Sequence, residues 1–143
     1  MIPDNATDLS GIINIAHDER RSELRVPLKM DVSVVYHQHK NAVTRPTYRG
    51  VTSDISIHGV SIVVDHNIFT DDDVTLLIGL VPESPNGPRK IIEVIARMVY
   101  TVYSPQHYAF RVGARFKEFK RNGRALLASN IERRMVRYSG QRL

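Results

Sequence analysis

At 143 residues, 42% of them hydrophobic and 24% charged, the chain has the length and composition of one globular domain, which excludes wholesale disorder. The absence of cysteine excludes disulfides, thiolate catalysis and cysteine-ligated zinc. The net charge of +5 comes entirely from residues 117–143, with 8 Lys/Arg against 2 Asp/Glu, and favours a solvated helix face. Without a signal sequence or an apolar run of membrane-spanning length, we expect a cytoplasmic location and no membrane insertion.

After the N-terminal segment, the chain changes to runs in which apolar and polar residues alternate. Such alternation predicts half-buried strands. The predicted strands cover residues 28–37, 47–55, 59–64, 74–80, 91–102 and 107–116. Hairpin-like connections between six short strands predict a mainly β fold, a closed six-stranded antiparallel barrel. In the fifth strand, the alternation assigns Tyr100 and Val102 to the same core face as Ile92.

A C-terminal α-helix is predicted after the strands, at about residues 122–138. Asn122 can cap it, and an apolar face follows from the four-residue spacing of Leu127, Ile131 and Met135. The predicted division of the chain is a flexible tail at 1–16, a domain at 17–138 that includes an arginine-rich arm at 17–25 and the helix, and a tail at 139–143.

Three arginines precede the first strand and predict contact with an anionic ligand. Arg21 and Arg25 lie four residues apart, and Arg20 comes directly before them. Guanidinium groups bind phosphate oxygens, or the O6/N7 edge of guanine, in bidentate geometry. For this segment taken alone, a solvated charge run remains the alternative.

A second motif, Asp54-Ile-Ser56-Ile-His-Gly59, lies at the corner between the second and third predicted strands. A carboxylate such as Asp54 can accept the N1 and N2 donors of guanine, and the hydroxyl of Ser56 can bind a phosphate or a base edge. Glycine at position 59 permits a tight turn beneath a ligand. Taken alone, the motif also fits a plain strand corner with local turn bonds.

Together and in this order, the two motifs resemble those of the PilZ family of cyclic di-GMP receptors. The family pattern is RxxxR followed by [D/N]xSxxG, and every specified position is matched by Arg21, Arg25, Asp54, Ser56 and Gly59. The resemblance covers roughly residues 17–138. It implies a six-stranded barrel that binds cyclic di-GMP on its outer surface, with the arginine segment wrapping the ligand.

The predicted function is that of a bacterial cyclic di-GMP receptor, in which ligand binding orders the arm and changes the surface offered to an unidentified downstream protein. Neither catalytic activity nor a cofactor is predicted. Arg20 supplies a third guanidinium and predicts room for two stacked cyclic di-GMP molecules, unless it is merely solvated. Two alternatives stay open, a PilZ-fold interaction domain without ligand and a barrel that binds nucleic acid through its basic C-terminal segment.

Three further groups of residues carry weaker predictions. His37 and His39 share a strand face, but no further ligand follows at a recognisable spacing, so no metal site is predicted. The acidic run at residues 71–73 lacks the pattern of a calcium loop and predicts a solvated turn. Tyr100 could stack on a guanine near the barrel rim, but strand parity favours the core.

Overall fold

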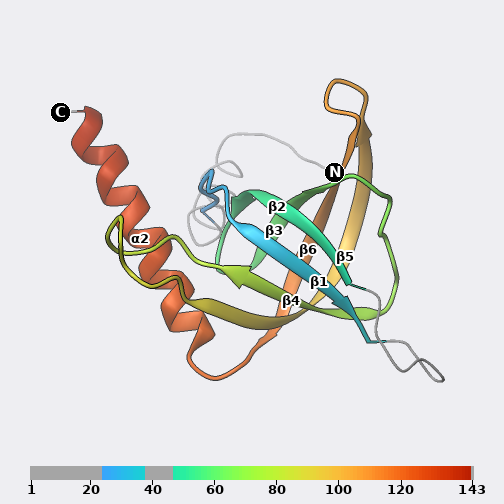
Figure 1. Cartoon of the computed structure of the whole chain (residues 1–143), viewed down its shortest axis with the longest axis horizontal. Helices are drawn as coiled ribbons and strands as arrows, with labels where there is room; N and C mark the ends of the chain where they lie inside the picture. Colours follow the sequence, from blue (N-terminus) through green and yellow to red (C-terminus); the bar gives the residue numbers. More distant parts are fainter. Residues whose placement is uncertain (1–23, 38–46, 143) are drawn as a thin grey trace, which may run out of the picture.

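The computed structural model describes residues 24–37 and 47–142, with side chains described as far as Met135. Within those ranges the chain forms six strands followed by one helix (Figure 1). The elements are β1 (Asp31–Tyr36), β2 (Thr47–Ile55), β3 (Gly59–Val64), β4 (Asp73–Gly79), β5 (Ile91–Ser104), β6 (Ala109–Phe119) and α2 (Gly123–Arg142).

The strands close into a barrel in the order β1-β2-β3-β6-β5-β4, and every neighbouring pair is antiparallel. Because successive side chains of a strand point to opposite faces, alternate residues fill the interior. Fully enclosed aliphatic side chains of this core include Val34, Ile55, Val60, Ile62, Val74, Leu76, Ile78, Val94 and Val112. The barrel with its C-terminal helix confirms the predicted fold class.

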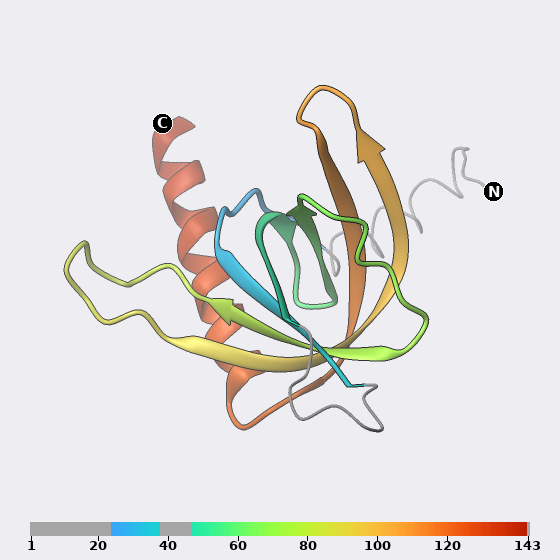
Figure 2. The same cartoon turned by 45° about the vertical axis from the view of Figure 1, so that its right-hand side comes forward.

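The helix α2 lies against one side of the barrel and extends past the strands (Figure 1 and Figure 2). Leu127 and Ile131 are buried as predicted, whereas Met135 is 38% exposed, so the predicted apolar face is wrong at Met135. The helix continues to Arg142, past its predicted end at about residue 138. In the described part of the chain, no helix combines the length and apolar character that a membrane span requires.

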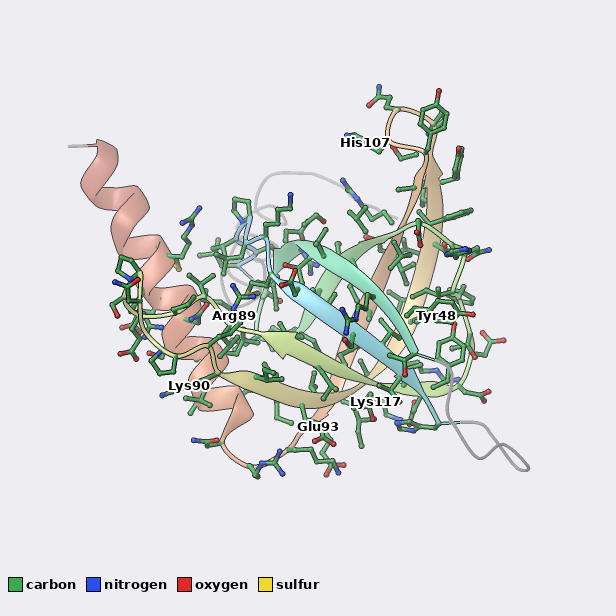
Figure 3. The ribbon with its side chains drawn as sticks, viewed as in Figure 1. Tyr48, Arg89, Lys90, Glu93, His107 and Lys117 are labelled. Atoms are coloured by element: carbon green, nitrogen blue, oxygen red, sulfur yellow. The ribbon has the colours of Figure 1, made fainter. Side chains whose placement is uncertain are left out.

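The longest strands, β5 and β6, form a hairpin that projects beyond the barrel (Figure 2), and Figure 3 shows His107 in its turn. A β-bulge interrupts β5 between Met98 and Tyr100, where Val99 is the extra residue. A bulge reverses the alternation of the residues that follow it. Tyr100 is therefore 39% exposed and Val102 57% exposed, and the prediction that both face the core is wrong.

Candidate functional site

Arg25, the first motif residue within the described ranges, is held beside the barrel by its neighbour Val26. The amide of Val26 donates to the carbonyl of Ile55 over 2.9 Å, and the amide of Ile55 donates to the carbonyl of Val26 over 3.0 Å. Val26 is also buried in the core. This pairing brings Arg25 next to Asp54, the residue before Ile55. Arg20 and Arg21 lie outside the described residues.

Asp54 reaches the outer surface because of a second bulge, in β2. The register of β2 and β3 shifts between Thr52 and Asp54 and leaves Ser53 as the extra residue. Thr52 and Ile55 both point into the core, where they are 1% and 0% exposed. Strict alternation would place Asp54 on the same side as Thr52, so the bulge moves its carboxylate from the interior to the outer face.

Arg25 joins the two strands of this corner through its guanidinium group. Its Nε donates to Oδ1 of Asp54 over 2.6 Å, and its Nη2 donates to Oγ of Ser61 on β3 over 3.4 Å. The side chains of Arg25 and Asp54 are 44% and 30% exposed to solvent. An ion pair this exposed contributes about 0–1 kcal/mol, so a ligand with stronger partners for either group can replace it.

Ser56 and Gly59 shape the turn between β2 and β3. The buried Oγ of Ser56 accepts hydrogen bonds from the amides of His58, over 3.0 Å, and Gly59, over 3.2 Å. Gly59 passes so close to β6 that a Cβ there would lie 2.5 Å from the carbonyl oxygen of Ala114. Glycine is therefore needed for close packing, whereas the sequence suggested a tight turn. The predicted contact of Ser56 with ligand stays a prediction.

A row of paired residues crosses four neighbouring strands of the outer face. In order across β2, β3, β6 and β5, it consists of Asp54, Ser61, Gly113 and Tyr100. The hydroxyl of Tyr100 lies 3.0 Å from Oγ of Ser61. Its ring covers Gly113, where a Cβ would lie 2.0 Å from the ring atom Cε2. Gly113 therefore makes room for the tyrosine ring, and Ser61 links that ring to Arg25.

Two arginines of β6 flank this row. Arg111 and Arg115 are exposed, and their even spacing puts both on the outer face, with Cα atoms roughly 13 Å apart along the strand. They open onto a pocket of about 390 Å³ that Arg25, Asp54, Gly59 and Tyr100 also line. Its volume is within the range of ligand clefts. A pocket of about 200 Å³ between α2 and the segment 80–90 contains none of the motif residues.

Sequence reasoning missed four residues of this pocket as site residues. Alternation along β6 is enough to place Arg111 and Arg115 on the outer face, but nothing local in the sequence indicates that β6 pairs with β3 and brings them to the motif. Tyr100 was assigned to the wrong face because no glycine or proline marks the bulge in β5. Ser61 follows the motif by two residues and carried no signal.

Two of the residues weighed as metal ligands, His37 and Asp73, contact other side chains. Nε2 of His37 lies 2.7 Å from Oγ1 of Thr75, and His39 lies outside the described residues. In the acidic run, Asp71 and Asp72 are exposed in the loop before β4, as predicted. Asp73 differs, because it begins β4 and accepts a hydrogen bond from Nζ of Lys117 over 2.8 Å. That bond is the main reason why the pKa of Asp73 is lowered. Among the described residues, no cluster of His, Cys, Asp and Glu could hold a metal ion.

The pocket brings guanidinium groups, one carboxylate and one aromatic ring to the outer face of a small barrel. Such a set suits an anionic ligand with a planar group, and it lies on the outside of a closed six-stranded β-barrel. The chain belongs to the PilZ domain family, which matches residues 19–133. This match confirms the family that the two motifs predicted.

Among solved structures, the chain is similar to the Bacillus subtilis inhibitor of motility, MotI/DgrA. The TM-score is 0.61 at 22% sequence identity, and the match covers 81% of this chain and 52% of that one. A likeness at this identity shows the fold, and the chain spans about half the length of that protein. No curated protein matches the chain.

Proposed function

We propose that this protein is a cyclic di-GMP receptor that binds its ligand in the pocket on the outer face of β2, β3, β5 and β6. The observation that supports it most is the convergence of Arg25, Asp54 and Gly59, which come from both motifs, on one open pocket. PilZ domains are receptor and effector domains, which supports binding and signalling over catalysis.

Each half of the ion pair between Arg25 and Asp54 has a counterpart in cyclic di-GMP. The guanidinium of Arg25 can bind a phosphate or the O6/N7 edge of guanine, and the carboxylate of Asp54 can accept from guanine N1 and N2. Ligand binding therefore exchanges the contact between the two side chains for two contacts with ligand. Ser56 supports the corner from below, since its hydroxyl is already bonded to backbone amides.

The signal passes on through contact with a downstream protein. In this proposal, Arg20 and Arg21 close over the ligand while Arg25 moves from Asp54 to a phosphate. The state with the arm closed then differs in surface from the empty state, and a partner that binds one state better shifts the population toward it.

Isothermal titration calorimetry with cyclic di-GMP tests the proposal, with cyclic di-AMP as the matched control. We expect saturable binding of cyclic di-GMP and at least tenfold weaker binding of cyclic di-AMP, because adenine lacks the N1 and N2 donors that Asp54 would accept. No binding of cyclic di-GMP would contradict the proposal and favour an interaction domain without ligand. Strongly salt-dependent binding to duplex DNA instead would favour the nucleic-acid alternative.

The same titration tests whether two stacked molecules bind. Two cyclic di-GMP molecules bring four negative charges, and a third guanidinium, that of Arg20, offsets part of their repulsion. We expect a stoichiometry near two for the wild type and near one for Arg20→Leu. A ratio near one for the wild type, or near two for the variant, would refute the role of Arg20.

A further inference from the structure

Two arginines face each other on the outer face of β5 and β6. Arg115 lies directly opposite Arg97 in the register of these strands, and like charges in such positions destabilise a sheet. Arg97 has Asp73 opposite it on its other side, on β4. Within the described residues, Arg115 has no salt-bridge partner, and on β3 it faces Gly59.

Arg111, two residues before Gly113, also lies on the outer face without an acidic neighbour across the strands. Its cross-strand neighbours are Val63 on β3 and the exposed Val102 on β5. The described part of the chain provides no salt-bridge partner for Arg111 either. The pocket wall therefore carries two guanidinium groups without an acid, on both sides of the tyrosine ring that covers Gly113.

We propose that Tyr100, Arg111 and Arg115 form a second subsite, separate from the two motifs, and this inference rests on the proposed function. The subsite binds one guanine and the phosphates on both sides of it. Each nucleoside of a cyclic dinucleotide lies between two phosphates, which matches a ring between two arginines. The ring of Tyr100 offers its exposed face for stacking, and each guanidinium binds one phosphate. The two nucleosides of one ligand are then held by different walls of the pocket.

Titrations of Arg111→Gln and Arg115→Gln with cyclic di-GMP at several salt concentrations test the two phosphate contacts. We expect each variant to bind at least fivefold more weakly and to show a smaller salt dependence of the dissociation constant, since each loses one contact with an anion. Arg97→Gln is the matched control, because Arg97 is an exposed arginine of the same sheet that does not line the pocket. It should change affinity less than fivefold.

The stacking contact is tested by Tyr100→Leu and Tyr100→Phe. The phenylalanine variant keeps the ring but loses the hydroxyl that lies beside Ser61, and it should bind within fivefold of the wild type. The leucine variant should lose at least fivefold. Thermal unfolding of all variants checks that the barrel is intact.

The outcomes separate this inference from the proposed function. If the wild type binds cyclic di-GMP and the two β6 variants bind within fivefold of it, the subsite is refuted and the receptor function stands. Equal weakening by Arg97→Gln would also refute it, because a general effect of positive charge would then explain the result. A wild type that binds no cyclic di-GMP would overturn the function and the subsite together.

Discussion

The two walls of the pocket are built in different ways. The corner between β2 and β3 is local, since Ser56 bonds to the amides of His58 and Gly59 within one turn. The wall on β5 and β6 is assembled from residues of two strands, with the ring of Tyr100 lying over Gly113. The corner is therefore held by backbone geometry and the opposite wall by side-chain packing. A side chain added to the backbone should therefore cost stability at the corner, where it meets backbone, and affinity at the opposite wall, where it displaces the ring of Tyr100.

The largest effect on affinity is expected at the corner. Arg25→Ala and Arg21→Ala should each abolish measurable cyclic di-GMP binding, because loss of a charge-assisted contact costs ~2–5 kcal/mol. For Arg25→Ala, thermal unfolding should change little, since its exposed ion pair contributes only about 0–1 kcal/mol. Arg49→Ala is the control, as an exposed arginine of β2 that lines a different pocket. Full affinity in either motif variant would contradict the assignment of the motifs.

Asp54→Ala should show whether the corner reads the base. We expect weaker binding of cyclic di-GMP, by roughly 1–3 kcal/mol, and little change for cyclic di-AMP, because only guanine offers two donors to this carboxylate. Competition titrations with both nucleotides measure the difference. Equal binding of the two nucleotides by the wild type would refute the role of Asp54 in recognition.

Alanine substitutions at Gly59 and Gly113 should affect the two walls differently. At Gly59 a Cβ would meet the backbone oxygen of Ala114, so Gly59→Ala should reduce the free energy of unfolding by ~1–3 kcal/mol. At Gly113 a Cβ would meet the ring of Tyr100, which can turn away. Gly113→Ala should therefore cost less stability but weaken cyclic di-GMP binding about fivefold or more. Urea unfolding and titration of both variants measure this; the reverse pattern would contradict the comparison.

The smallest effect is expected for Lys117, a β6 cation that has an acidic partner. Its hydrogen bond holds the pKa of Asp73 below the ordinary value of 3.8. A carboxylate with a lowered pKa contributes stability above its unfolded pKa and loses it as the pH falls through the folded pKa. Lys117→Gln should thus lower stability slightly at pH 7, and the difference should shrink as the pH falls through the folded pKa of Asp73.

Urea unfolding at pH 7 and at acidic pH measures this difference for Lys117→Gln, with Arg115→Gln as the comparison. Because Arg115 faces Arg97 without an acid among the described residues, its replacement should leave stability unchanged or raise it. A loss of stability in Arg115→Gln as large as in Lys117→Gln would show that the two cations are equally paired.

Local patterns in the sequence were sufficient for the barrel and for the motif residues that line one wall of the candidate pocket. Alternation along each strand predicted the six strands, because the period of two depends only on the residues of that strand. The corner motif was recognisable because Asp54, Ser56 and Gly59 lie close together in the sequence, around the turn from β2 to β3, and are therefore close in space. Arg25 was predicted as a ligand-binding residue because it matches the same family pattern.

Only the tertiary structure decided which residues oppose that corner. The pairing of β3 with β6 brings Gly113 beside Ser61, although the two residues are far apart in the sequence. The bulge at Val99 turns Tyr100 outward, and the bulge at Ser53 does the same for Asp54. A bulge arises where two paired strands must accommodate one extra residue, so it depends on the partner strand as much as on its own residues. For that reason the alternation within β5 placed Tyr100 in the core, and the barrel places it in the pocket.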